Sequence, residues 1–187
     1  MIMCLDILRN APAAIANAKK QKKMGKTAAV LGESAVLFAA AAGVIIAGSG
    51  LYSALLISSV VSVLVTVIVA GLLLGLIIHI AASTLGGKGK YFEGLTAVTY
   101  ALLPISAAML ISAVLTLLPF TSGLQLIVIA VGIAYGFAIL YRGIKELYST
   151  DMVTSLVAVS VSILALLMAV YASVGLSLLT RVAALPV

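Results

Sequence analysis

Residues that carry chemistry are scarce in this chain. Its 187 residues include one cysteine, one histidine, five acidic residues and no tryptophan. A single cysteine, Cys4, excludes an internal disulfide, a two-cysteine redox motif and a cysteine-rich zinc site. One histidine and five scattered carboxylates offer no HExxH motif and no clustered metal ligands. We therefore expect no metal, no cofactor and no catalytic set, and the protein is not expected to be an enzyme.

Charged residues are scarce as well, whereas apolar residues are in excess. The chain is 64% hydrophobic and 9% charged, compared with about half apolar and about a quarter charged in a soluble domain. A soluble fold of this length cannot bury so much apolar surface, so the excess must face lipid. The net charge of +6 does not indicate nucleic-acid binding, because that function needs a basic face with stacking aromatic side chains.

Five apolar runs are long enough to cross a membrane, since about 20 residues span a hydrocarbon core of about 30 Å. They cover residues 27–48, 51–83, 94–118, 124–141 and 152–173. The sequence therefore predicts an all-α polytopic membrane protein, with a bundle of five transmembrane helices in one domain, 27–175. A basic leader, 1–26, precedes this domain, and a short tail, 176–187, follows it.

The cations lie almost entirely on one side of these spans. That side holds Arg9, Lys19, Lys20, Lys22, Lys23, Lys26, Lys88, Lys90, Arg142 and Lys145, and the other side holds only Arg181. Short loops rich in Lys and Arg remain in the cytoplasm. We therefore predict a multi-pass protein of the cell membrane, with its N-terminus in the cytoplasm and its C-terminus outside.

The leader carries the densest group of cations. Asn10 and Pro12 predict the start of an amphipathic helix over 11–24. One interpretation places this helix in the membrane interface, with its lysines reaching anionic headgroups. The other is a solvated basic leader.

The stretch GGKGK at residues 86–90 raises the question of phosphate binding. A P-loop requires GxxxxGK[ST] after a strand, so that backbone amides can surround a phosphate. Here Thr84 occupies the first glycine position, Tyr91 occupies the Ser/Thr position, and an apolar run precedes the stretch. We therefore interpret it as a turn between two membrane helices, in which Lys88 and Lys90 can hold headgroups.

Small residues and one proline predict how the helices pack. Gly71 and Gly75, like Gly132 and Gly136, form GxxxG pairs, which allow two helix backbones to approach closely in lipid. Pro104 lies inside the third span, where proline kinks a helix or removes the usual donor to a carbonyl one turn earlier.

Two ionisable residues, Glu33 and His79, lie within spans, where such groups are costly and are candidates for function. One interpretation pairs them across neighbouring helices as a proton- or ion-sensitive contact. In the other, Glu33 reaches the interface or pairs with Lys26, and His79 caps local carbonyls. Tyr100 is expected to anchor the chain at an interface or to donate a hydrogen bond between helices.

The loop over 141–151 mixes charges of both signs. Thr150 or Asp151 is a natural N-cap for the fifth span. Arg142 and Lys145, together with residues 88–93, either form a cytoplasmic docking face or belong to a plain solvated loop.

Several of these short motifs together are similar to the Yip-domain family of small membrane proteins, and to its prokaryotic (archaeal or bacterial) branch in particular. They are Gly86-Gly-Lys-Gly, Phe92-Glu-Gly94, Tyr100-Ala-Leu-Leu-Pro104 and Leu140-Tyr-Arg-Gly-Ile-Lys-Glu-Leu, and the similarity covers about residues 79–175. The resemblance implies a bundle of five membrane helices. In eukaryotic members it implies binding of prenylated Rab-type GTPases in vesicle traffic, but their acidic DLxGP motif is replaced here by KKQKKMGK.

The first functional hypothesis is a non-enzymatic scaffold or adaptor with a role in membrane organisation or trafficking. Its basic cytoplasmic segments would bind anionic lipid or a cytoplasmic protein, and the chain could also form a homo-oligomer. The alternatives are a small transporter or channel, based on Glu33, His79, Pro104 and the GxxxG pairs, and an accessory subunit of a larger membrane complex.

Overall fold

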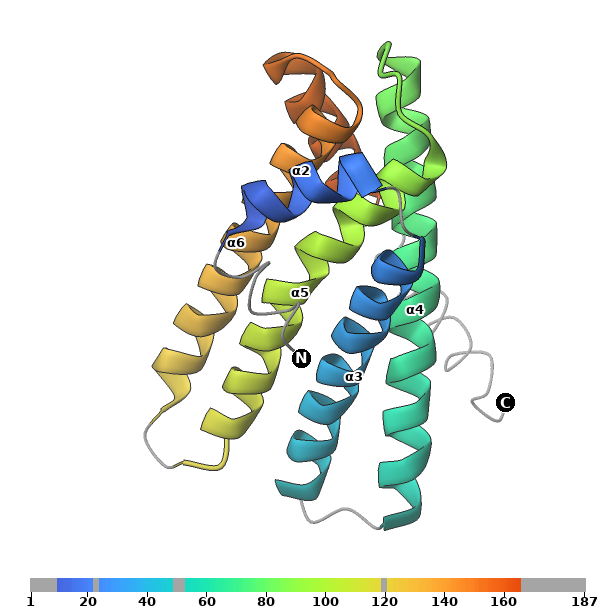
Figure 1. Cartoon of the computed structure of the whole chain (residues 1–187). Coiled ribbons are helices and arrows are strands. Elements are labelled where there is room, and N and C mark those ends of the chain that lie inside the picture. The colour runs from blue at the N-terminus through green and yellow to red at the C-terminus, as the bar shows by residue number, and fades with distance from the viewer. Residues whose placement is uncertain (1–9, 22–23, 49–52, 119–120, 166–187) are drawn as a thin grey trace, which may run out of the picture.

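The computed structural model describes residues 10–21, 24–48, 53–118 and 121–165. Regular structure in this part of the chain is entirely helical (Figure 1). The helices are α2 (Ala11–Gln21), α3 (Met24–Gly48), α4 (Ser53–Thr84), α5 (Tyr91–Leu115), α6 (Ser122–Leu147) and a last helix, Met152–Ala165. Four of them, α3 to α6, are long and apolar enough to cross a membrane, and the last one is apolar but shorter. The prediction of an all-α polytopic membrane protein is confirmed.

The predicted spans coincide with these helices over most of their lengths. The fifth span, predicted for 152–173, begins at Met152 as a helix, and its residues 166–173 lie outside the described residues. Three helices run well past the predicted spans, since α3 begins at Met24, α5 begins at Tyr91 and α6 ends at Leu147. Lysine, arginine and glutamate end an apolar run without ending a helix, because their helix propensities are high.

Helix α5 forms the centre of the bundle. It packs against α3, α4 and α6, and 56% of its most apolar segment is buried, compared with 17% for α4 and for α6. The two outer helices expose rows of large apolar side chains such as Val65 and Leu73 on α4 and Val131 on α6. In a membrane protein these rows face lipid, so the low burial of α4 and α6 agrees with spanning helices.

Small residues allow α5 and α6 to pack closely between Gly132 and Gly143. A Cβ atom on Gly132 would lie 2.2 Å from Cβ of Ala108, and one on Gly136 would lie 2.8 Å from the carbonyl oxygen of Ala101. One on Gly143 would lie 2.9 Å from Cβ of Ala97. The GxxxG pair of α6 therefore lies at a helix contact, and Gly143 extends that contact toward the end of α6.

The GxxxG pair of α4 serves two different neighbours. A Cβ on Gly71 would lie 2.8 Å from the side chain of Leu31 on α3, whereas one on Gly75 would lie 3.0 Å from Cα of Leu95 on α5. Helix α4 continues to Thr84, nine residues beyond Gly75. Because α5 begins only four residues before Leu95, the last turn of α4 projects beyond the start of α5, as Figure 1 shows.

Helix α2 lies across one end of the bundle rather than along it (Figure 1). Ala11 and Ile15 are buried, and they belong to the same apolar cluster as Tyr100 on α5 and Leu147 on α6. This part of the apolar face of α2 is therefore covered by protein. The predicted amphipathic helix exists, but these residues pack against the bundle, because the ends of α5 and α6 offer them an apolar surface.

Candidate functional site

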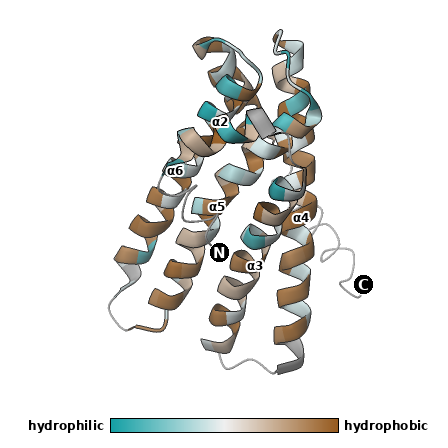
Figure 2. Cartoon of the chain, viewed as in Figure 1, coloured by the Kyte–Doolittle hydropathy of each residue, from teal (hydrophilic) through white to brown (hydrophobic). Residues whose placement is uncertain are grey.

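The described cations gather at one end of the bundle, which we call the basic end. It consists of α2, the start of α3, the end of α4 with the loop 85–90, and the end of α6 with the turn 148–151 (Figure 2). Lys19, Lys88, Lys90, Arg142 and Lys145 are exposed there, and Lys26 is half-buried. Lys20 belongs to α2, and Lys22 and Lys23 lie outside the described residues.

Lys19 ties α2 to the end of α6. Its Nζ donates hydrogen bonds to the carbonyl oxygen of Glu146, at 2.5 Å, and to Oγ of Ser149, at 2.9 Å. The last carbonyls of a helix lack partners within the helix and carry partial negative charge, so an ammonium group is stabilised at this position. Lys19 therefore fixes the position of α2 in addition to contributing charge to the surface.

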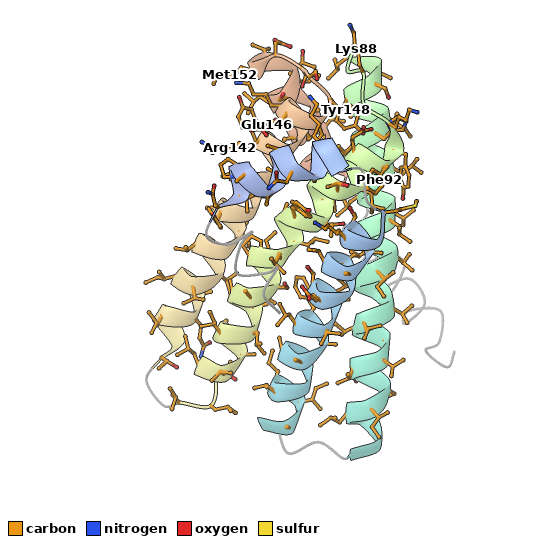
Figure 3. All side chains as sticks on the ribbon, in the orientation of Figure 1. Lys88, Phe92, Arg142, Glu146, Tyr148 and Met152 are labelled. Atoms are coloured by element: carbon orange, nitrogen blue, oxygen red, sulfur yellow. The ribbon has the colours of Figure 1, made fainter. Side chains whose placement is uncertain are left out.

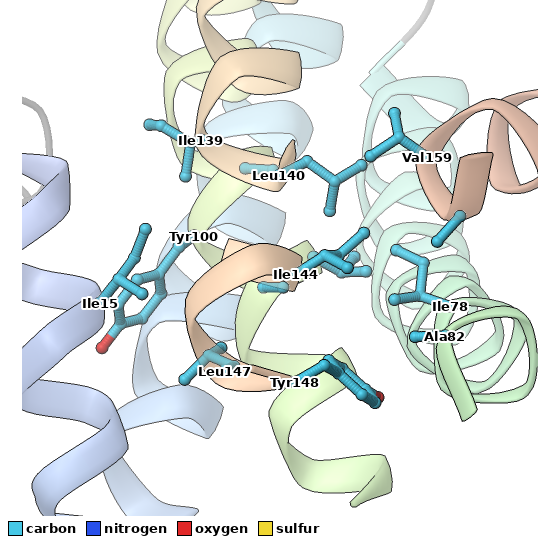
Figure 4. Packing of buried hydrophobic residues seen from close by; sticks show 14 of the residues in the cluster. Ile15, Ile78, Ala82, Tyr100, Ile139, Leu140, Ile144, Leu147, Tyr148 and Val159 are labelled. Atoms are coloured by element: carbon cyan, nitrogen blue, oxygen red, sulfur yellow. The ribbon is translucent and has the colours of Figure 1, made fainter. Parts of the chain in front are cut away.

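The buried centre of the basic end is Tyr148, which follows the last residue of α6. Its side chain is fully buried (Figures 3 and 4). Cβ atoms added to Gly89 and Gly87 would lie 2.4 Å and 3.1 Å from the ring, and one on Gly94 would lie 2.7 Å from the hydroxyl oxygen. The glycines of GGKGK and the glycine in the first turn of α5 thus leave the space that the tyrosine occupies, and we call this arrangement the tyrosine clamp.

Hydrogen bonds complete the tyrosine clamp. The hydroxyl of Tyr148 donates to the carbonyl oxygen of Lys90 at 3.2 Å and lies 3.3 Å from Nδ1 of His79. The backbone N–H of Lys88 donates to the carbonyl oxygen of Tyr148 at 3.1 Å. The hydroxyl has one proton, and it donates this proton in its hydrogen bond with the carbonyl oxygen of Lys90. It can therefore only accept a hydrogen bond from His79, which requires the His79 tautomer with its proton on Nδ1.

The environment keeps this tyrosine protonated. Burial raises the pKa of Tyr148 above its ordinary value, and the negative charge of Glu93 raises the pKa further. The hydroxyl therefore remains a donor throughout the physiological range. The clamp joins α4, the loop 85–90, α5 and the end of α6 through a neutral group.

Two helix caps fix the loops on either side of the clamp. The carboxylate of Glu93, itself buried, accepts a hydrogen bond from the backbone N–H of Lys90 at the start of α5. Of the two N-cap candidates, Thr150 and Asp151, it is Asp151 whose carboxylate accepts hydrogen bonds from the Thr154 side chain and from backbone N–H groups of the first turn, and these bonds lower its pKa. Thr150 instead bonds Ser155 through its hydroxyl, at 2.8 Å.

The structure does not bring Glu33 and His79 together. Leu31 on α3 lies against Gly71 on α4. Glu33 follows Leu31 by two residues toward the far end of the bundle, whereas His79 follows Gly71 by eight residues toward the basic end. At 1.5 Å per residue the two positions are roughly 15 Å apart along the helix axes. His79 contacts the ring of Tyr148 instead, with 6.2 Å between ring centroids, and Glu33 is half-buried on α3.

Tyr100 and Pro104 lie in the interior of α5. Tyr100 is buried beneath α2 beside Ile15 (Figure 4), so it lies at a contact between helices. Pro104 is buried as well, and α5 runs through it as one helix. The carbonyl oxygen of Pro104 would lie 3.2 Å from a Cβ on Gly132. Both residues therefore contribute to packing of the bundle.

The sequence alone did not single out Tyr148. Its signal is the set of glycines in GGKG and FEG, which indicates that something bulky packs against this loop. The identity of that residue depends on where α6 ends, and hydropathy placed the end of the fourth span at Tyr141. Within the described ranges, no group of three or more His, Cys, Asp or Glu residues could hold a metal ion.

Comparison with family models matches residues 11–174 to the Yip1 domain. No curated protein and no solved structure matches the chain. The match covers most of the 187 residues, including all the described helices and the whole tyrosine clamp. The chain belongs to the Yip1 domain family of membrane proteins.

Proposed function

We propose that this Yip1-domain protein is a non-enzymatic membrane scaffold whose basic end faces the cytoplasm and binds anionic lipid headgroups. The observation that carries the proposal is the position of the exposed cations. Lys88 and Lys90 come from one loop, and Arg142 and Lys145 come from the last turns of α6. Lys88 and Arg142 lie at the same end of the bundle (Figure 3). Basic groups next to the inner leaflet attract anionic lipids, with about 1 kcal/mol for each cation near the surface.

The length of α4, compared with the thickness of the hydrocarbon core, supports the proposal. Helix α4 has 32 residues, which corresponds to about 48 Å at 1.5 Å per residue, whereas the hydrocarbon core is about 30 Å thick. If the opposite ends of the helices lie at the outer interface, then the end of α4 and the loop 85–90 extend into the inner headgroup region. Lys88 and Lys90 then lie where phosphates are abundant.

The test is lipid selectivity of the full-length protein in nanodiscs that contain equal amounts of phosphatidylglycerol and phosphatidylcholine. Lipids that stay bound after extraction are counted by native mass spectrometry. We expect phosphatidylglycerol to be enriched around the protein and the enrichment to fall as salt rises. Replacement of Lys88, Lys90, Arg142 and Lys145 by glutamine should lower the enrichment markedly, with the remainder coming from the lysines of α2 and of the start of α3.

A matched control exchanges the same four residues between lysine and arginine, which preserves the charge and should preserve the enrichment. Equal retention of the two lipids by the unmodified protein would refute the proposal. So would an enrichment that is as strong in the glutamine variant as in the unmodified protein. A cytoplasmic protein partner and a homo-oligomer stay predictions, and co-purification in native lipid tests both.

A further inference from the structure

Few side chains hold α2 against the bundle. Ala11 and Ile15 are its buried apolar residues, and Ile15 is the larger of the two. Ala13 and Asn17 are exposed. A helix of 11 residues is marginal on its own, since isolated helices shorter than about 12–15 residues are barely stable in water. The position of α2 therefore depends largely on the burial of Ile15 and on the hydrogen bonds of Lys19 with the end of α6.

Anionic lipid competes for the ammonium group of Lys19. This residue is exposed, so a headgroup can approach it. The end of α6 offers about half of an elementary negative charge, whereas a phosphatidylglycerol headgroup carries a full one. A phosphate that approached Lys19 in its docked position would also meet the carbonyl oxygen of Glu146, whose partial negative charge repels it. Lys19 therefore binds either the end of α6 or a phosphate, and not both.

The surface beneath α2 lies near the hydrocarbon boundary. Gly75 of α4 lies against Leu95 of α5, so Tyr100 is level with a residue about 21 Å from the end of α4. With the far ends of the helices at the outer interface, α4 extends about 18 Å beyond the hydrocarbon core. Acyl chains can therefore cover Tyr100 when α2 leaves it, and Ile15 can enter the same interface.

We propose that anionic lipid releases α2 from the bundle, so that the helix lies in the membrane interface with Lys19 on a headgroup. In neutral lipid α2 stays docked across the basic end, which is the state in Figure 1. The inference rests on the proposed function, because anionic lipid must first gather at the basic end. It adds that the basic end has two states and that the charge of the membrane selects between them.

The experiment measures the distance between two nitroxide labels by pulsed electron paramagnetic resonance. The full-length, cysteine-free protein carries the labels at Ala13→Cys on α2 and Leu126→Cys on α6, which are exposed positions. It is placed in nanodiscs of phosphatidylcholine alone or with an equal amount of phosphatidylglycerol. We expect one distance in the neutral lipid and a second population in the mixture. The ratio of released to docked protein should rise about fivefold or more, as the attraction of one cation to an anionic surface predicts.

Substitutions of Lys19 and Ile15 separate the two contributions to docking. Lys19→Gln should make the change between the two lipids about fivefold smaller, because this side chain can no longer move to a phosphate. Lys19→Arg is the matched control, which keeps the charge and should keep the change. Ile15→Ala should increase the released population about tenfold or more even in neutral lipid, because most of the apolar contact is lost.

A second measurement uses buried cysteines and the uncharged reagent N-ethylmaleimide. Leu147 is buried at the end of α6, in the cluster that contains Ile15 (Figure 4). Leu147→Cys should react about fivefold faster in the anionic nanodiscs, in proportion to the released population. Ala82 is also buried, but it lies beside Tyr148 on the α4 side (Figure 4), so Ala82→Cys should react at the same rate in both lipids.

An unchanged distance distribution would overturn the inference, and so would a response of Lys19→Gln as large as that of the unmodified protein. Lipid retention is measured by native mass spectrometry on the same nanodiscs. Enrichment of phosphatidylglycerol around a protein whose α2 stays docked would reject the release and leave the headgroup proposal intact. Absence of both enrichment and release would reject the two together.

Discussion

Removing the side chain of Tyr148 should reveal how much the tyrosine clamp contributes to stability. The ring is fully buried, and glycines of the loop 85–90 contact it directly. Truncation of a buried aromatic residue to alanine costs about 3–5 kcal/mol, because the cavity that it leaves is only partly refilled. Tyr148→Ala should therefore lower the free energy of unfolding by an amount within this range.

Tyr148→Phe isolates the contribution of the hydroxyl group. The variant keeps the ring but removes the bonds with Lys90 and His79, at 3.2 and 3.3 Å. A typical hydrogen bond contributes about 0.5–1.5 kcal/mol net. Since the carbonyl oxygen of Lys90 also accepts a hydrogen bond from the backbone N–H of Glu93 at 3.0 Å, it keeps a partner in the variant, so we expect a loss of about 1 kcal/mol, near the middle of that range.

The measurement is reversible unfolding by SDS in mixed micelles, followed by circular dichroism, together with amide hydrogen exchange of the loop 85–90. Tyr141→Phe is the matched control, because the Tyr141 hydroxyl makes no hydrogen bond with the described residues and the ring is only half-buried. The control should stay within about 0.5 kcal/mol of the unmodified protein. If Tyr148→Ala cost less than the phenylalanine variant, or if loop exchange were unchanged in both, the clamp would not hold this loop.

Three further predictions concern other parts of the fold. Gly132→Ala should destabilise the protein by about 1–3 kcal/mol in the same assay, because its new methyl group would overlap a methyl group of α5, whereas Gly123→Ala, with open space around the added atom, should be close to neutral. The pKa of Asp151 is lowered in the folded protein, so its capping contribution is present above the unfolded pKa of about 3.9 and is lost as the pH falls through the folded pKa. Exchange of the first amides of Met152–Ala165 should accelerate over that window, and Asp151→Asn should remove the pH dependence. In a cysteine-free background, Lys88→Cys should react with an impermeant maleimide only from the cytoplasmic side, and Gly123→Cys should react only from outside. The reverse pattern would show that the predicted topology is wrong.

The fold could be predicted largely from hydropathy because lipid imposes simple rules on a chain. Apolar runs of about 20 residues must be helices in a bilayer, so α3 to α6 follow from the sequence. Their ends do not follow in the same way, since α6 continues for six residues past Tyr141. The apolar pattern indicates which part of a helix lies in the hydrocarbon core, whereas backbone hydrogen bonding and helix propensity decide where the helix ends.

The candidate site was predictable only in part. The positions of Lys88, Lys90, Arg142 and Lys145 at one end follow from their places between spans. The partner of His79 does not follow from the sequence. To predict it, one must know how far each helix is shifted along its axis relative to its neighbour, which we call the axial register. That register depends on contacts such as Leu31 against Gly71, which no single-sequence pattern encodes.

The clamp also bears on what the basic end recognises. Tyr148 holds the loop that carries Lys88 against the helix end that carries Lys145, so it fixes the spacing between cations from two segments. A fluid bilayer does not need this spacing, because each anionic lipid diffuses to whichever charge it meets. A folded protein partner does need it, because its own charges are fixed and preorganisation contributes to affinity. Tyr148→Ala should therefore preserve phosphatidylglycerol enrichment if lipid is the ligand, and it should weaken capture by about tenfold or more, or ~1.4 kcal/mol, if a folded partner docks there.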